Sequence, residues 1–173
     1  DARSTKLAGL EDDMEAALEA LAIELDAINT PPAGVAAPRR PALPTGPIGP
    51  AGIASILGAK IPENAIVVDE GVTTGREFFP ETAGAPPHSW INNRGGSIGY
   101  GLPVAIGAAV ACPDRKVIAL EGDGSAMYTI QSLWTMAREG LDVTVLVFAN
   151  HSYNILRGEL TNVGVRNPGP RAV

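Results

Sequence analysis

Cysteine is almost absent from this sequence, in which Cys112 is the single cysteine among 173 residues. One thiol cannot form an intrachain disulfide, so a reducing compartment is the expected setting. We therefore predict a cytoplasmic location. A lone cysteine of this kind is more often a small core residue than a nucleophile.

Clusters of basic residues are also missing. The chain has 13 Lys and Arg against 19 Asp and Glu, which gives a formal net charge of −6, and the pair Arg39-Arg40 is too short to form a basic patch. Because nucleic-acid-binding surfaces are strongly basic, we expect no nucleic-acid partner. A local basic pocket for a phosphate would not be visible in the total charge.

The sequence lacks an apolar run of membrane-spanning length. The most apolar stretch, from Ile98 to Cys112, falls short of roughly 20 residues and contains Gly99, Gly101 and Pro103 near its start. We interpret it as a buried helix after a glycine-rich turn and expect no membrane association. The acidic N-terminus has no basic region followed by an apolar run, so no signal peptide is predicted. Since the chain begins without Met, we expect a fragment or the ordered remainder of a longer protein.

The first 50 residues divide into a helix and a connector. From Leu7 to Ile28, apolar residues recur every three or four positions with acidic residues between them, which predicts an amphipathic helix. This spacing also fits a short coiled coil, but we favour the last helix of a preceding domain, residues 1–28. Seven prolines within residues 29–50 remove backbone donors and predict an extended linker. Residues 51–173 are then a second domain.

A β-branched run from Ala65 to Glu70 predicts a buried strand, followed by a turn over residues 71–75. Thr73 and Thr74 lie just after this strand, where α/β sheets present ligand-binding groups. Their hydroxyl groups could instead cap a helix over residues 76–79, and the sequence leaves both roles open. Residues 81–97 are predicted to form a loop.

Two polar segments are predicted to meet at one edge of the sheet. Asp123 follows a predicted strand over residues 116–120, and Asn150 follows another over residues 143–149. A helix of about 14 residues between them spans about 21 Å, and the second strand returns about 23 Å. Asn150 is therefore expected beside Asp123 on a parallel strand. That strand is apolar at nearly every position, which favours an α/β fold, a parallel sheet with helices on both faces.

Oxygen atoms dominate this predicted edge. Asp123 supplies a carboxylate, Asn150 an amide oxygen and Ser152 a backbone carbonyl, a set that leaves room on Mg²⁺ for phosphate oxygens and water. A glycine-rich turn at a helix N-terminus also suits a phosphate. An Asp-Gly turn and an Asn at a strand end also occur without any ligand, so each is weak evidence alone.

The motif at residues 122–125 (GDGS), with Asn150 after one helix and one strand, resembles the diphosphate and metal motif of thiamine-diphosphate-dependent enzymes. Residues 95–103 (GGSIGYGLP) are similar to the segment that lines their cofactor. The resemblance extends over nearly all of the chain and is greatest to acetolactate synthase large (catalytic) subunits and benzoylformate decarboxylases. It implies the thiamine-diphosphate-binding fold: the end of a middle domain, a linker, and a pyrophosphate-binding domain that is incomplete at its C-terminus.

The resemblance also implies roles for individual residues. Asp123, Asn150 and the Ser152 carbonyl would bind Mg²⁺. The Gly96 carbonyl would accept a hydrogen bond from the aminopyrimidine of thiamine diphosphate. Ile98 would be an apolar wedge that bends the cofactor and brings its amino group next to the thiazolium carbon. The full set of implied cofactor-binding residues is Val72, Thr73, Gly96, Ser97, Ile98, Gly122, Asp123, Gly124, Ser125, Asn150, Ser152 and Tyr153.

The sequence departs from the family pattern at two positions. Ala149 stands where the first of two Asn residues is common, and His151 stands where relatives often have Gly, which alters the turn that carries Ser152. The activating glutamate of the family belongs to a pyrimidine-binding domain, usually of a partner subunit. No catalytic residue is therefore assigned in this chain. The resemblance implies a homodimer or homotetramer, and this polypeptide alone is expected to be inactive.

The resemblance implies an enzyme that acts on a 2-oxo acid. In an acetolactate synthase, pyruvate loses CO₂ and its remaining two carbons join a second 2-oxo acid. In a decarboxylase of the benzoylformate type, the product is an aldehyde. A cofactor-binding relative without activity is a further alternative. A generic dinucleotide-binding domain is disfavoured, because no complete glycine fingerprint follows a strand.

Overall fold

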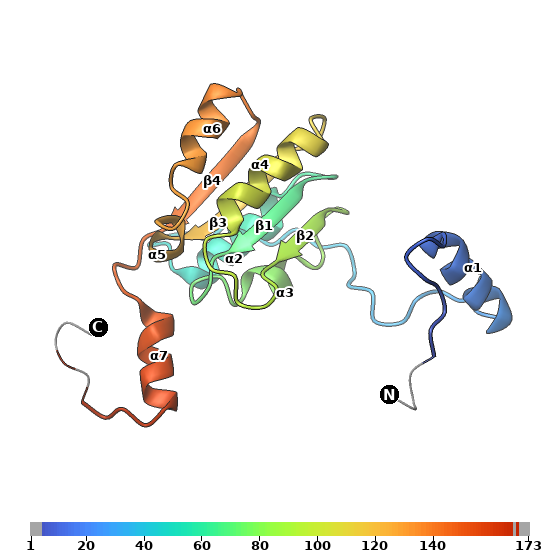
Figure 1. Ribbon diagram of the computed structural model, residues 1–173, viewed down its shortest axis with the longest axis horizontal. Coiled ribbons are helices and arrows are strands. Elements are labelled where there is room, and N and C mark those ends of the chain that lie inside the picture. Colours follow the sequence, from blue (N-terminus) through green and yellow to red (C-terminus); the bar gives the residue numbers. More distant parts are fainter. Residues whose placement is uncertain (1–4, 168, 170–173) are drawn as a thin grey trace. The chain divides into compact units, whose positions relative to one another are not determined.

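A computed structural model describes residues 5–167 and residue 169 of this protein (Figure 1). The chain separates into two compact units, Asp1–Val35 and Ala36–Val173. Among the described residues, no helix has both the length and the apolar character that crossing a membrane requires.

In its described residues, 5–35, the first unit contains one helix, α1 (Met14–Glu24). It begins where the Asp13 side chain accepts a hydrogen bond from the Ala16 amide at 3.0 Å, and it ends at Leu25, just before Asp26 adopts a φ of 52°. The helix predicted over residues 7–28 is therefore too long at both ends, because an N-cap and a left-handed residue define a shorter one. No residue of α1 is buried.

The second unit is built on a four-stranded sheet. Its strands are β1 (Ile66–Glu70), β2 (Ser89–Asn92), β3 (Val117–Gly122) and β4 (Val143–Phe148). They lie in the order β2-β1-β3-β4, and every neighbouring pair is parallel. The predicted α/β class is confirmed.

Strand β2 corrects the loop predicted over residues 81–97. It has only four residues, SWIN, and it lies between Pro86-Pro87 and Asn93. So short a run gives no clear apolar periodicity. Its formation depends on pairing with β1, where Val67 lies opposite Trp90 and Val68 opposite Ile91.

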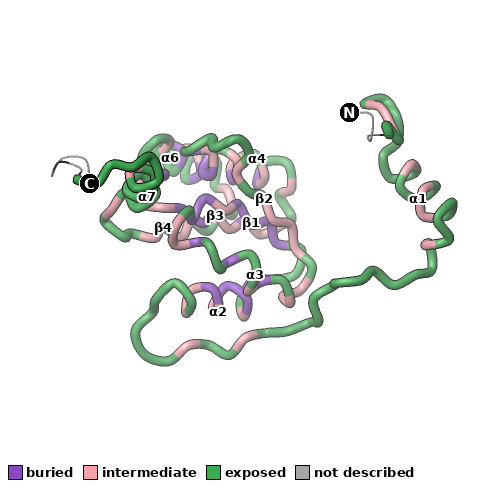
Figure 2. Tube along the Cα trace, turned by 90° about the horizontal axis from the view of Figure 1, so that it is seen from below, coloured by how far each residue is buried: buried purple, intermediate pink, exposed green. Residues whose placement is uncertain are grey.

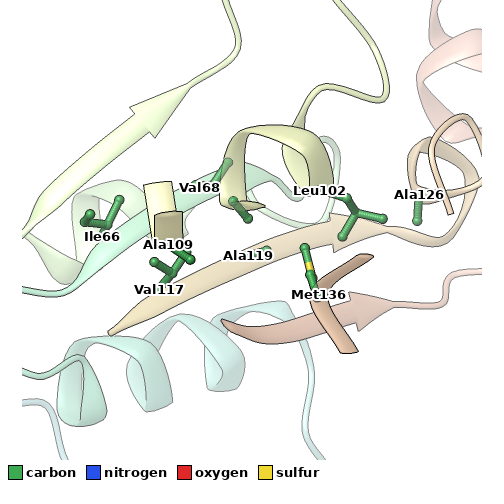
Figure 3. Packing of buried hydrophobic residues seen from close by; sticks show 9 residues of the cluster. Ile66, Val68, Leu102, Ala109, Val117, Ala119, Ala126 and Met136 are labelled. Carbon is green, nitrogen blue, oxygen red and sulfur yellow. The ribbon is translucent and has the colours of Figure 1, made fainter. Parts of the chain in front are cut away.

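Helices cover both faces of the sheet, as Figure 2 shows. On one face, α2 (Pro50–Lys60) and α3 (Phe78–Thr82) contribute to a core with Leu57, Phe78, Val67 and Leu120. On the other, α4 (Gly101–Ala111) and α6 (Ser132–Arg138) pack on residues of β1 and β3 (Figure 3). Alternate side chains of each strand point to opposite faces, so a strand buried on both sides is apolar throughout.

The single helix predicted between residues 124 and 140 is instead two short helices, α5 (Asp123–Ala126) and α6. Between them the amides of Tyr128 and Thr129 donate to carbonyls three residues back, Ser125 at 3.1 Å and Ala126 at 3.2 Å. The Thr129 hydroxyl donates to the Gly99 carbonyl at 2.8 Å. This tertiary bond, invisible in helical periodicity, accompanies the break in the helix.

The proline-rich segment crosses the boundary between the units. From Ala36 onwards it belongs to the second unit, where the Arg39 amide donates to the Gly84 carbonyl at 2.7 Å. The Arg40 guanidinium donates to the carbonyls of Ala59 at 3.0 Å and Ile61 at 2.8 Å, at the end of α2. The extended conformation follows from proline, while attachment to α2 depends on Arg40. The predicted domain limits of 1–28, 29–50 and 51–173 stay a prediction.

Candidate functional site

The carboxyl ends of β3 and β4 bring the two predicted polar segments together. In the pairing of these strands, Gly122 lies opposite Phe148, so Asp123 and Asn150 follow neighbouring strand ends. The His151 amide donates a hydrogen bond to Asp123 Oδ2 at 3.0 Å. The predicted return of residue 150 to the edge that carries Asp123 is therefore confirmed, although the intervening helix is broken.

A cavity lies at this edge of the sheet, and four parts of the chain line it. They are residues 71–74 after β1, Ile98 before α4, residues 122–125 with Tyr128, and Asn150 with residues 152–156. The predicted residues among them are Val72, Thr73, Ile98, Gly122, Asp123, Gly124, Ser125, Asn150, Ser152 and Tyr153. Gly96 and Ser97 do not line the cavity.

The first wall is a tight turn after β1. The amides of Thr74 and Gly75 donate to the Gly71 carbonyl at 3.1 and 3.0 Å. A Cβ atom on Gly71 would lie 3.1 Å from Gly75 Cα, so both glycines are needed for this close approach. Thr73 and Thr74 face the cavity, while α3 has Glu77 as its N-cap residue. The alternative role of these threonines as a helix cap is thus not adopted.

Val72, in the same turn, has a φ of 45°. A β-branched residue in this left-handed region is strained, and such strain is concentrated at functional sites. The left-handed conformation of Val72 lies in the turn that lines the cavity, and nothing in the sequence indicates this conformation.

The second wall is the glycine turn that opens α5. Asp123 Oδ1 accepts a hydrogen bond from the Gly124 amide at 3.1 Å, and the Ser125 hydroxyl donates to the Gly122 carbonyl at 3.1 Å. A Cβ atom on Gly124 would lie 2.8 Å from Cε1 of Tyr153. Glycine at position 124 therefore lets the Tyr153 ring pack directly against the turn.

The third wall is the loop after β4. Asn150 Oδ1 accepts a hydrogen bond from the Ser152 amide at 2.9 Å, and His151 has a φ of 53°. The positive φ gives a reason why glycine would suit position 151, as histidine tolerates this region less easily. These hydrogen bonds fix the Asp123 and Asn150 side chains, whose oxygens keep further lone pairs for a ligand.

The oxygen donors at this edge fit a hard cation such as Mg²⁺ in chemical type. They comprise one carboxylate, one amide and one candidate backbone carbonyl. No group of three or more His, Cys, Asp or Glu side chains suited to a metal occurs in residues 5–167 or at residue 169. A site of the predicted kind contains a single acidic side chain, and Mg²⁺ binding by Asp123, Asn150 and Ser152 stays a prediction.

The segment before α4 carries the other predicted residues. Gly95 and Gly96 have φ values of 69° and 71°, and the Gly96 carbonyl accepts a hydrogen bond from the Ile98 amide at 2.9 Å. The backbone of Ser97 is bonded through both its N–H and its C=O to the Asn93 side chain, each at 3.0 Å. Ile98 points its apolar side chain to the cavity and remains 46% exposed.

Two buried glutamates beside this segment were not predicted. Glu70 and Glu121 lie opposite each other in the pairing of β1 and β3, with exposed fractions of 3% and 0%. Glu70 accepts hydrogen bonds from the amides of Gly99 and Gly101, while both Glu121 oxygens lack a partner in the part of the chain that the structure describes. Burial, and then the charge of Glu70, raises the pKa of Glu121 to about 8.

The sequence signal for these glutamates was an acidic residue directly before glycine at the end of each of two apolar strands. The same buried environment shifts the pKa values of two neighbouring side chains, Asp69 and Tyr100. Burial is the main cause that raises the pKa of Asp69 and of Tyr100, and for Tyr100 the charges of Asp69 and Glu70 add to it. Other cavity residues were missed because α7 (Asn154–Asn162) was not predicted: Asn154, Ile155 and Leu156.

Fold and site together define an α/β domain whose cavity opens at the carboxyl ends of parallel strands, the usual place for a ligand in this class. Residues 79–171 match the family described as "Thiamine pyrophosphate enzyme, C-terminal TPP binding domain". The chain belongs to this family.

Similar proteins agree with this assignment. The chain is 53% identical over 158 residues to a Mycobacterium tuberculosis protein provisionally named acetolactate synthase large subunit IlvX, covering 91% of this chain and 30% of the relative. It is 35% identical over 147 residues to benzoylformate decarboxylase of Pseudomonas aeruginosa, covering 84% of this chain and 28% of the relative. This chain thus spans less than a third of either relative.

Among solved structures, the chain is similar to the thiamine diphosphate-dependent 4-hydroxybenzoylformate decarboxylase of Rhodococcus jostii RHA1. The TM-score is 0.68 at 30% identity, over 90% of this chain and 30% of that one. Benzoylformate decarboxylase from Polynucleobacter necessarius has a TM-score of 0.57 at 23% identity, over 78% of this chain and 26% of that one, which supports the fold alone.

Proposed function

We propose that this chain is the part of a thiamine-diphosphate- and Mg²⁺-dependent enzyme that binds the cofactor diphosphate. The observation that carries the proposal is the convergence of Asp123, Asn150 and Ser152 on one cavity with the turn over residues 71–74. Carboxylate and amide oxygens bind Mg²⁺, and Mg²⁺ neutralises phosphate oxygens. The bound cofactor would supply the chemistry of breaking the bond between a 2-oxo acid and its carboxylate.

The other residues of the cavity hold and orient the cofactor in this proposal. Gly124, Ser125, Tyr153 and the segment Val72-Thr73 contact the diphosphate. Because Gly124 has no side chain, the Tyr153 ring packs directly against the turn proposed to hold the diphosphate. The Gly96 carbonyl, which already accepts from the Ile98 amide, has a second lone pair for the aminopyrimidine. Ile98 supplies an apolar surface to the rings.

For the reaction, we propose acetolactate synthesis, the decarboxylation of pyruvate followed by carboligation. The 53% identity to the provisionally named acetolactate synthase subunit supports it. The second candidate is a 2-oxo acid decarboxylase of the benzoylformate type. Similarity to the decarboxylases of Pseudomonas aeruginosa and Rhodococcus jostii supports this alternative. A cofactor-binding relative without activity is the third.

The proposed enzyme is a homodimer or homotetramer. Its activating glutamate would come from a pyrimidine-binding domain of a partner subunit. The chain spans 30% of the Mycobacterium tuberculosis relative, which leaves room for such a domain in a protein of that length.

A cofactor titration tests the proposal. Thiamine diphosphate with Mg²⁺ should raise the unfolding temperature of the purified protein, and Asp123→Ala should remove this shift. Asp114→Ala is a matched control, because Asp114 is exposed and lies before β3 rather than after it. Retained Mg²⁺-dependent affinity in Asp123→Ala would show that the metal assignment is wrong.

A product assay on the full-length protein, in which the proposed pyrimidine-binding domain is present, then separates the reactions. With pyruvate as substrate, acetolactate indicates the synthase and acetaldehyde the simple decarboxylase. Formation of benzaldehyde from benzoylformate would favour the second candidate. No ligand-dependent stabilisation together with no release of CO₂ would overturn the enzyme proposal.

A further inference from the structure

The Glu70 carboxylate holds the backbone of a distant segment. Glu70 is the last residue of β1, and its Oε1 accepts a hydrogen bond from the Gly99 amide at 2.5 Å. Its Oε2 accepts from the Gly101 amide at 2.7 Å. The carboxylate is buried, so these bonds form away from water and are stronger than at the surface.

Other contacts hold the same segment from further sides. The Thr129 hydroxyl donates to the Gly99 carbonyl at 2.8 Å, so the N–H and the C=O of Gly99 are both bonded. The Tyr100 hydroxyl donates to the Asp69 carbonyl at 2.5 Å. Residues 99–101 are thereby tied to the end of β1 and to the turn before α6. Ile98, the residue directly before Gly99, lines the cavity.

The Glu70 carboxylate accepts hydrogen bonds at the N-terminus of α4, where the side chain of an N-cap residue usually accepts them. Tyr100 is the N-cap residue of α4 and makes no side-chain capping bond in the described part of the chain. A carboxylate is favourable at this end of a helix, because the free amides carry partial positive charge. The space is also closely filled: a Cβ atom on Gly101 would lie 2.0 Å from Glu121 Oε1 and 2.8 Å from Glu70 Oε2.

Burying two adjacent carboxyl groups is costly, and a pair of apolar side chains would fill this volume at lower cost. An apolar side chain could not accept hydrogen bonds from the two amides. The acceptor function of Glu70 therefore accounts for a carboxylate at position 70 better than packing does.

We propose that Glu70 is a positioning residue, which fixes Gly99 and Gly101 so that Ile98 lies where the organic rings of thiamine diphosphate contact the protein. This inference rests on the proposed function. In the described part of the chain, the hydrogen bonds of the Glu70 carboxylate go to the Gly99 and Gly101 amides and not to the segments proposed to hold the diphosphate, residues 71–73, 122–125 and 150–153. Loss of Glu70 should therefore weaken recognition of the rings and leave recognition of the diphosphate unchanged.

Calorimetric titration of two ligands tests this separation. We expect Glu70→Gln to weaken binding of thiamine diphosphate with Mg²⁺ by about tenfold, the effect of losing roughly one charge-assisted hydrogen bond. Inorganic diphosphate with Mg²⁺ should bind the variant and the wild type within about twofold. Glu63→Gln, an exposed glutamate before β1, is the matched control. Equal weakening for both ligands would overturn the proposal.

A double-mutant cycle with Ile98→Ala shows whether Glu70 acts through Ile98. If it does, Glu70→Gln should have little further effect on thiamine diphosphate affinity once Ile98 has been truncated. If the double variant instead loses affinity by the product of the two single-variant losses, Glu70 and Ile98 act independently, which would contradict this inference. Thr129→Val, which removes the bond on the other side of Gly99, should show the same ligand selectivity and serves if Glu70→Gln folds poorly.

Amide hydrogen exchange provides a test without any ligand. In the wild-type protein the Gly99 and Gly101 amides should be protected compared with Gly95 and Gly96, and Glu70→Gln should reduce that protection. Unprotected Gly99 and Gly101 amides would overturn the inference. If the wild type binds no thiamine diphosphate, the proposed function fails, while the exchange measurement still decides whether Glu70 fixes the segment.

Discussion

Glu121 buries its carboxyl group at the end of β3, next to Glu70, and its pKa rises from an ordinary value of 4.5 to about 8. The unfolded chain releases this proton above about pH 4.5, whereas the folded protein keeps it until about pH 8. The folded state therefore binds more protons in this window, and the stability contributed by Glu121 is lost as the pH rises through it.

We accordingly predict that the free energy of unfolding falls between about pH 5 and pH 8, by up to about 1.4 kcal/mol per pH unit for one proton. Glu121→Gln, which cannot ionise, should flatten this dependence, and Glu63→Gln should not. Urea unfolding across the pH range measures it. An unchanged slope in Glu121→Gln would contradict the assignment.

A second residue-scale prediction concerns two glycines of α4. Gly101→Ala should destabilise the protein by about 1–3 kcal/mol, because its Cβ would overlap the buried glutamate pair. Gly107→Ala, in the same helix, should be stabilising by up to about 1 kcal/mol, since a Cβ there meets no described atom within 4 Å. Thermal unfolding of the two variants compares them directly, and similar behaviour would show that the contact at Gly101 has no cost.

At the scale of secondary-structure elements, Arg40 joins the proline-rich segment to α2. Its guanidinium binds carbonyls at the end of that helix, which have no partners within the helix itself. Arg40→Ala should cost about 1.5–3 kcal/mol of stability. Arg39→Ala, whose partner Glu81 lies in a largely exposed ion pair, should cost under about 1 kcal/mol. Chemical unfolding of both variants tests the difference; equal losses would refute it.

The sequence predicted the elements that rely on local pattern. The apolar runs that end at Glu70, before Gly122 and before Asn150 identified three strands of the sheet, and the glycine-rich start of α4 was also recognised. Strand β2 was missed because four residues between prolines and asparagines carry no pattern without their partner strand. The break between α5 and α6 was missed because Thr129 bonds to Gly99, which lies 30 residues away.

The residues of the site also divide into those that local sequence pattern predicts and those that depend on tertiary contacts. Asp123 and Asn150 could be brought together by adding the lengths of a helix and a strand, both of which are local quantities. The Glu70–Glu121 pair depends on the register between β1 and β3, which no sequence spacing fixes. Left-handed Val72 likewise follows from the packing of Gly71 on Gly75 rather than from its own preference.

At the scale of the whole molecule, the proposed function makes stabilisation by the cofactor depend on a metal. Removal of Mg²⁺ with a chelator should abolish the increase in unfolding temperature caused by thiamine diphosphate, and added Mg²⁺ should restore it. Differential scanning fluorimetry with and without chelator measures this. A shift that persists after chelation would indicate that the diphosphate binds through protein groups alone.

The hydrogen bonds between the Glu70 side chain and the Gly99 and Gly101 amides also close a loop of the chain. The loop that leaves β1 at Glu70 returns to the same carboxylate about 30 residues later, after passing through α3 and β2. Both ends of this loop are fixed at one side chain. The spacing of the cavity walls on either side of Glu70 is thus set by that carboxylate and not by the length of the chain between them.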